Sequence, residues 1–146
     1  MVKNEEIFMV SPLNPGTVHT YESLMKVIVH EFTHVLVGKI NSNTDMYLNE
    51  GIAVVEGNQM NINMKNYLKE AINLNKLPTI DEMINSFDDL NQPYVVSGGF
   101  VEFLINTYGY DKVVEIISEP HNIESITENS KDILLETWIE YIVKSY

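Results

Sequence analysis

The sequence of 146 residues contains no cysteine and few basic side chains. Without thiols, disulfide bonds and cysteine-ligated zinc or iron–sulfur sites are excluded. Nine Lys and Arg residues against 21 Asp and Glu residues give a net charge of -12. This acidic balance argues against nucleic acids and anionic membranes as partners, because both attract positive charge. No apolar run approaches the roughly 18–20 residues that a membrane-spanning helix needs.

The first residues, MVKNEEIFMVSP, also lack the pattern of a signal peptide, because their apolar run is short and lies beside acidic residues. We therefore expect a cytoplasmic location by default. The composition, 45% hydrophobic and 21% charged, is typical of a globular protein. At this length we expect a single domain over residues 1–146, either complete or a fragment of a longer protein.

Hydrophobic periodicity and capping residues predict a mainly α-helical chain. Only residues 7–10 have the pattern of a β-strand. We expect helices from Thr20 to about Gly38 and from Asp45 to about Gly57, and further helices over residues 63–75, 79–87, 93–108, 111–118 and 131–143. The expected fold class is mainly α with a minimal β edge (α+β).

An HExxH motif, His30-Glu31-Phe32-Thr33-His34, lies inside the first expected helix. Residues four apart project from the same helix face, so His30 and His34 can bind one metal ion. Glu31 leans toward the same face and is placed to take a proton from a metal-bound water. The flanking residues are apolar, and we expect a helix of this kind to be buried, where two histidines need a partner such as a metal ion.

A catalytic zinc site needs a third protein ligand, and Glu50 is the best candidate. It follows His34 after 15 intervening residues, beyond a polar loop that can reverse the chain. The small side chains of Gly51 and Ala53 would let its helix approach the HExxH helix closely. The alternative is a solvated carboxylate in the first part of a helix.

The two segments HEFTH and YLNEGIA together resemble the gluzincins, the HExxH…E metallopeptidases of the peptidase MA clan that include aminopeptidase N and thermolysin-like enzymes. The resemblance implies a reduced zincin-like metalloprotease catalytic domain. It implies one Zn²⁺ per chain, held by His30, His34 and Glu50, with Glu31 as the general base. It also implies a peptide or protein substrate.

A third segment, QPYVVSGGF, is similar to a region of aminopeptidase-N-type enzymes in which a tyrosine stabilises the oxyanion. Tyr94 is the matching position, and a phenol near zinc can donate to a developing oxyanion. The alternative is a core tyrosine that opens a helix. Ser97, Gly98 and Gly99 would let the same helix pass close to another backbone or to substrate. Glu56 is a candidate for orienting a ligand imidazole, but a solvated helix residue is the favoured interpretation.

The chain departs from these families in its short His34–Glu50 spacing, in lacking a glycine-rich exopeptidase motif, and in lacking most of the N-terminal β-sheet. The first hypothesis is an active zinc peptidase. The second is a catalytically inactive zincin-like domain that binds peptides or a partner protein. A third is a metal-dependent hydrolase with another substrate, because site chemistry alone does not name the substrate. The sequence leaves endo- or exopeptidase action and the oligomeric state open.

Overall fold

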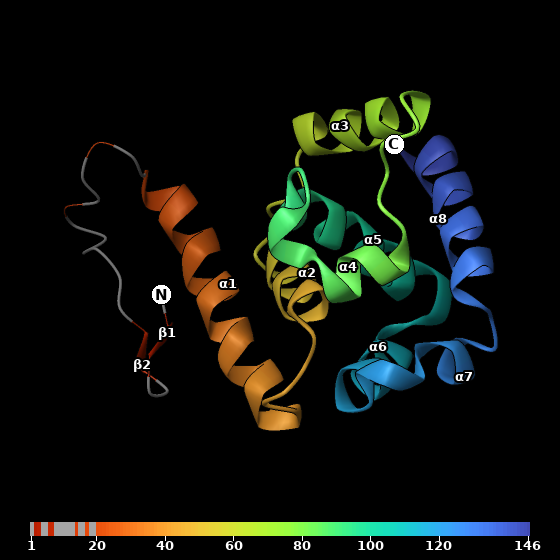
Figure 1. The fold of residues 1–146 in the computed structure, drawn as a ribbon. Helices are drawn as coiled ribbons and strands as arrows, with labels where there is room; N and C mark the ends of the chain where they lie inside the picture. The colour runs from red at the N-terminus through yellow and green to blue at the C-terminus, as the bar shows by residue number, and fades with distance from the viewer. Residues whose placement is uncertain (1, 4–5, 8–13, 15–16, 18–19) are drawn as a thin grey trace.

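The computed structural model describes residues 2–3, 6–7, 14, 17 and 20–146, and helices dominate it (Figure 1). The elements are β1 (Val2–Lys3), β2 (Glu6–Ile7), α1 (Tyr21–Ile40), α2 (Met46–Glu56), α3 (Ile62–Asn73), α4 (Ile80–Asn85), the 3-10 turn η1 (Phe87–Asp89), α5 (Pro93–Tyr108), α6 (Tyr110–Ser118), the 3-10 turn η2 (Pro120–Asn122), α7 (Ile123–Thr127) and α8 (Lys131–Ser145). The expected mainly α class is confirmed.

The two strands form a minimal antiparallel hairpin, in which Val2 pairs with Ile7 and Lys3 pairs with Glu6. The expected strand over residues 7–10 is not shown. Ile7 ends β2, and residues 8–10 lie outside the described residues. A β edge beside the helices therefore stays a prediction.

Local capping chemistry sets the helix ends much as the sequence predicts. The Thr20 hydroxyl accepts a hydrogen bond from the Ser23 N–H, and Thr79 and Glu82 form the expected capping box. Pro93 occupies the first turn of α5, and the chain leaves this helix at Gly109 with a φ of 87°. Two short elements that the sequence pattern did not predict, η2 and α7, lie between α6 and α8.

The most extensive helix contact joins α2 to α5 at the centre of the molecule. A Cβ atom on Gly51 would lie 2.5 Å from Val101 Cγ2 and 2.7 Å from the Ser97 carbonyl oxygen. The expectation that Gly51 admits the HExxH helix is therefore wrong, since Gly51 faces α5. The expectation that the segment Ser97 to Gly99 passes close to another backbone holds at the Ser97 carbonyl, which lies against the α2 backbone at Gly51.

One hydrophobic core extends from this contact toward the C-terminal helix. Trp138 of α8 is fully buried, its ring packs at 5.1 Å from that of Phe100, and its Nε1 donates a hydrogen bond to the Gly99 carbonyl oxygen at 3.2 Å. Leu68 of α3 fills the space that Gly99 leaves open. The core therefore holds α2, α3 and α8 in place around α5.

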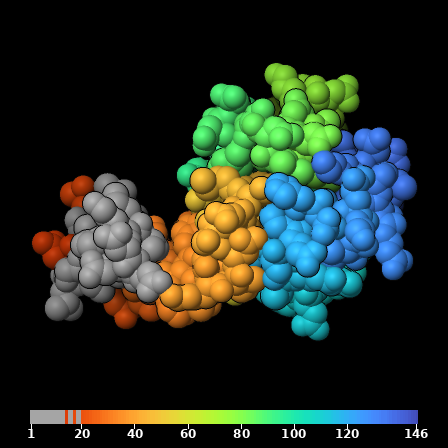
Figure 2. Space-filling model, turned by 60° about the horizontal axis from the view of Figure 1, so that its bottom comes forward, coloured from red at the N-terminus to blue at the C-terminus, as the bar shows by residue number. Residues whose placement is uncertain are grey.

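Helix α1 lies at the edge of the helical body and packs mainly against α2 (Figures 1 and 2). Only Leu24, Thr33 and Val37 of this helix are buried. The expectation of a buried HExxH helix is therefore wrong for one of its faces, because apolar side chains such as Phe32 and Leu36 are half-exposed. Within the described part of the chain, no helix is long and apolar enough to cross a membrane.

The two α-helical glycines of α1 and α2 give a paired test of this packing. We expect Gly51→Ala to lower the free energy of unfolding by about 1–2 kcal/mol, because the clash with the Ser97 carbonyl outweighs the gain in helix propensity. No atom of the described residues lies within 4 Å of a Cβ atom on Gly38, so Gly38→Ala should raise stability by about 0.5–1 kcal/mol. Urea denaturation measures both, and a neutral or stabilising Gly51→Ala would contradict the packing.

Candidate metal centre

The reversal of the chain between α1 and α2 sets how the two helices face each other. Asn41 ends α1, and its side-chain amide donates to the Ile117 carbonyl oxygen at 3.1 Å. The Thr44 hydroxyl lies within hydrogen-bonding distance of the carbonyl oxygens of Asn41 and Ile117, at 2.9 and 3.1 Å. These bonds tie the loop to the end of α6, so α2 returns along α1 at a defined angle.

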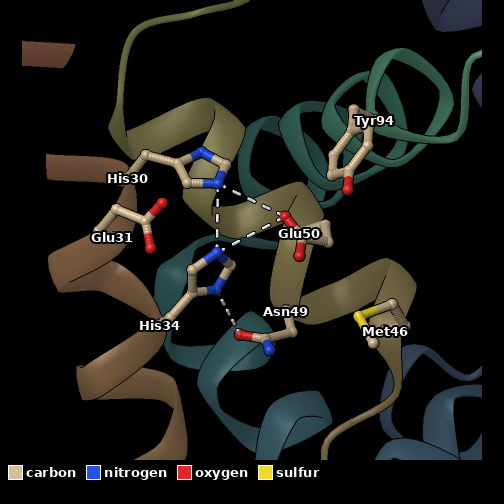
Figure 3. Close-up of a pocket in the computed structure, with 7 residues that line it drawn as sticks. All are labelled: His30, Glu31, His34, Met46, Asn49, Glu50 and Tyr94. Carbon is tan, nitrogen blue, oxygen red and sulfur yellow. Dashed lines mark hydrogen bonds and ion pairs between the residues drawn. The ribbon is translucent and has the colours of Figure 1, made fainter. Parts of the chain in front are cut away.

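Three candidate ligands meet where α1 and α2 face each other (Figure 3). His30 Nε2 lies 3.2 Å from His34 Nε2, and Glu50 Oε2 lies 3.4 Å from the first and 3.5 Å from the second. The three side chains are 15–16% exposed, so they are largely shielded while one side stays open to solvent. Two imidazole nitrogens and one carboxylate oxygen at these separations are close enough to hold a metal ion.

Asn49, one residue before Glu50, fixes the orientation of one imidazole. Its Oδ1 lies 2.9 Å from His34 Nδ1. An amide oxygen only accepts hydrogen bonds, so Nδ1 of His34 carries the proton and the lone pair of Nε2 is directed toward His30 and Glu50. Nδ1 of His30 is buried and has no hydrogen-bond partner among the described residues.

Asn49 was not predicted as an orienting residue. Glu56, a candidate for that role beside the favoured interpretation of a solvated helix residue, does not take the orienting role. Glu56 Oε1 instead accepts a hydrogen bond from the Tyr110 hydroxyl at 2.8 Å, outside the pocket that holds the histidines. This bond raises the pKa of Tyr110, since the phenol donates to a carboxylate. Asn49 could have been recognised by its position beside Glu50, which puts both residues in the same turn of α2.

The five residues predicted as metal ligands or catalytic groups all line one pocket of about 480 Å³. Glu31 lies next to the two imidazoles, and its carboxylate is turned toward them in Figure 3. The complete lining consists of His30, Glu31, His34, Met46, Asn49, Glu50 and Tyr94. The pocket therefore combines two carboxylates with two imidazoles, a set that favours a bound cation.

Tyr94 enters the pocket from a third helix, at the N-terminal end of α5. Its side chain is 50% exposed, so the alternative of a core tyrosine is wrong. The ring packs edge-on against Phe87 at a centroid distance of 6.0 Å, which fixes its position beside the opening. In Figure 3 its hydroxyl points to the side of the pocket where Glu50 lies.

A helical domain with paired histidines on one helix and a glutamate on the next defines a zincin-like class. The chain belongs to the peptidase MA superfamily, whose family model matches residues 17–133. That range contains His30, Glu31, His34, Glu50 and Tyr94. Neither a curated protein nor a solved structure matches the chain.

The contact between Asn49 and His34 predicts a selective effect on metal binding. We expect Asn49→Ala to weaken the affinity for a divalent metal 10–100-fold, because the His34 ring loses the partner that sets its tautomer and orientation. Competition with a chromogenic chelator measures the affinity. Asn63→Ala, on the exposed start of α3, is the control and should bind metal as the wild type does. Equal affinities in the two variants would rule out an orienting role for Asn49.

Proposed function

We propose that this chain is a zinc-dependent peptidase of the gluzincin type, with one Zn²⁺ held by His30, His34 and Glu50. The observation that carries the proposal is the triangle of donor atoms with sides of 3.2, 3.4 and 3.5 Å. Ligands about 2.0–2.1 Å from a tetrahedral zinc ion are about 3.3 Å apart. A pair of imidazoles with one carboxylate also leaves a fourth position for water, as catalytic zinc requires.

Hydrogen bonds among the three side chains do not by themselves satisfy all three groups. With Nδ1 bonded to Asn49, His34 presents a lone pair at Nε2, and the Glu50 carboxylate adds negative charge at the same point, while the buried Nδ1 of His30 has no hydrogen-bond partner among the described residues. A cation removes this repulsion. Membership of the peptidase MA superfamily supports the same conclusion, since its members are usually metal-dependent peptidases.

A zinc ion held by His30, His34 and Glu50 would lower the pKa of its bound water to about 7 and would polarise the scissile carbonyl. Glu31 then takes the proton of the attacking water and passes it to the leaving amine. Tyr94, across the pocket, donates a hydrogen bond to the oxyanion of the tetrahedral intermediate. Asn49 keeps the His34 ring in the orientation that leaves its Nε2 free to bind.

We propose a peptide or protein as the substrate and one catalytic domain over residues 1–146. The opening of the pocket toward solvent, between α1, α2 and the start of α5, supports access by an extended chain. Peptide added along a β edge would bind by backbone hydrogen bonds. The strand expected for that role begins at Ile7, and its remaining residues lie outside those described.

Replacing the general base separates metal binding from hydrolysis. We expect the wild type to contain about one zinc per chain and to cleave members of a peptide library. Glu31→Gln should keep the zinc and lose activity 10²–10⁴-fold, because the amide cannot take a proton. Metal analysis and mass spectrometry of the digested library provide the two measurements.

The control is Glu22→Gln, an exposed glutamate in the first turn of the same helix, which should cleave at the wild-type rate. A folded wild type that binds no zinc at neutral pH would contradict the proposed metal site. Zinc binding without cleavage would support the metal site and contradict the proposed peptidase activity.

A second pair of variants addresses the oxyanion. Tyr94→Phe should lower kcat about 10²–10³-fold with little change in KM, because the hydroxyl acts in the transition state. Tyr110→Phe is a matched control, since Tyr110 has a similar exposed fraction of 52% and donates to Glu56 instead. Equal kcat values for the two variants would remove Tyr94 from the mechanism.

A further inference from the structure

Helix α1 carries a continuous apolar stripe on the face that does not hold the histidines. Six side chains at successive spacings of 4, 4, 3, 4 and 4 residues form this α1 stripe, and each is 41–65% exposed: Tyr21, Met25, Val29, Phe32, Leu36 and Ile40. Such spacing puts all six on one side of the helix over a length of about 28 Å. An apolar face of this size on a single helix is typical of a surface that another molecule covers.

The stripe continues into a groove of about 340 Å³ between α1 and α6. Apolar side chains of α6, including Val113, Val114 and Ile117, form its other wall. The hydroxyl of Thr33 in the groove already donates to the Val29 carbonyl oxygen at 2.8 Å. The groove therefore offers apolar contact and little demand for new hydrogen bonds.

The charge of the protein limits the kind of partner that fits. Among the described residues, no Lys or Arg lines the groove, and the chain has a net charge of -12. An anionic membrane or a nucleic acid would be repelled. The spacing of 3 and 4 residues is that of helices that pack lengthwise on each other, so a helix is the matching partner.

The stripe is symmetric about its own midpoint, between His30 and Glu31. In an antiparallel second copy of α1, Tyr21 lies opposite Ile40, Met25 opposite Leu36 and Val29 opposite Phe32. Every apolar residue then meets an apolar residue, and each layer combines side chains of different shape. This is the self-complementarity that a two-fold interface requires.

The area is also that of a stable interface. A half-exposed side chain of this size has a solvent-accessible area on the order of 100 Å². The six residues of the stripe together with Val114 therefore offer roughly 700 Å² per copy, and a standard interface takes about 800 Å² from each partner.

We propose that two copies of this chain associate through antiparallel packing of their α1 stripes. The metal ligands face α2 on the other side of the helix, so the pairing leaves the pocket open. The proposal does not depend on zinc binding or on peptidase activity.

Sedimentation velocity over a range of concentrations tests the association of the full chain. The wild type should sediment as a dimer of the 16.7 kDa chain, and Leu36→Glu should sediment as a monomer with an unchanged circular dichroism spectrum. Leu74→Glu is the matched control, because Leu74 is 54% exposed against 50% for Leu36 but lies at the end of α3. This control should remain dimeric.

The absence of cysteine allows a test of the antiparallel register. Met25→Cys and Leu36→Cys, mixed and oxidised, should form a disulfide-linked heterodimer, whereas each variant alone should cross-link poorly. Preferential linkage of Met25→Cys to itself would indicate a parallel pair and contradict the register.

A wild type that stays monomeric at every concentration would overturn the proposal, as would a dimer that survives Leu36→Glu. Flotation with phosphatidylcholine vesicles then tests the alternative that a lipid surface covers the α1 stripe. Vesicle binding by a monomeric wild type but not by Leu36→Glu would assign the α1 stripe to a lipid surface and reject the dimer.

Discussion

The close contact of α2 with α5 at Gly51 is the constraint on which the candidate site depends. With no side chain at this position, the α2 backbone lies directly against Val101 and the Ser97 carbonyl. One face of α2 is thereby fixed in the core, and the opposite face presents Asn49 and Glu50 to α1. A carboxylate on a helix held in this way keeps its position without an ion. The entropy lost in ordering the Glu50 side chain is therefore lost on folding and not on ion binding.

The two halves of the site differ in how firmly the fold supports them. Glu50 and Asn49 belong to a helix enclosed by the core, whereas the histidines and Glu31 belong to a helix at the edge of the molecule. The ties from Asn41 and Thr44 to Ile117 anchor one end of that edge helix. Its remaining outer face is apolar, so any molecule that covers it also restrains the helix that carries the general base.

Local rules predicted much of this structure from sequence. The i,i+4 spacing placed His30 and His34 on one face, and capping residues located most helix ends. Periodicity could not say which apolar face of α1 the core would cover, because the helix is apolar on more than one side. The partner of Gly51 and the role of Asn49 depend on contacts between helices, which single-helix patterns do not encode.

The single tryptophan lies outside the candidate metal site, in the core between α5 and α8. Trp138 is fully enclosed and its indole N–H is bonded to the Gly99 carbonyl oxygen. Its fluorescence will therefore report the dissolution of the α5–α8 core in a denaturation experiment. Opening of the edge helix alone would be silent in that signal, so an optical unfolding curve describes the scaffold and not the pocket.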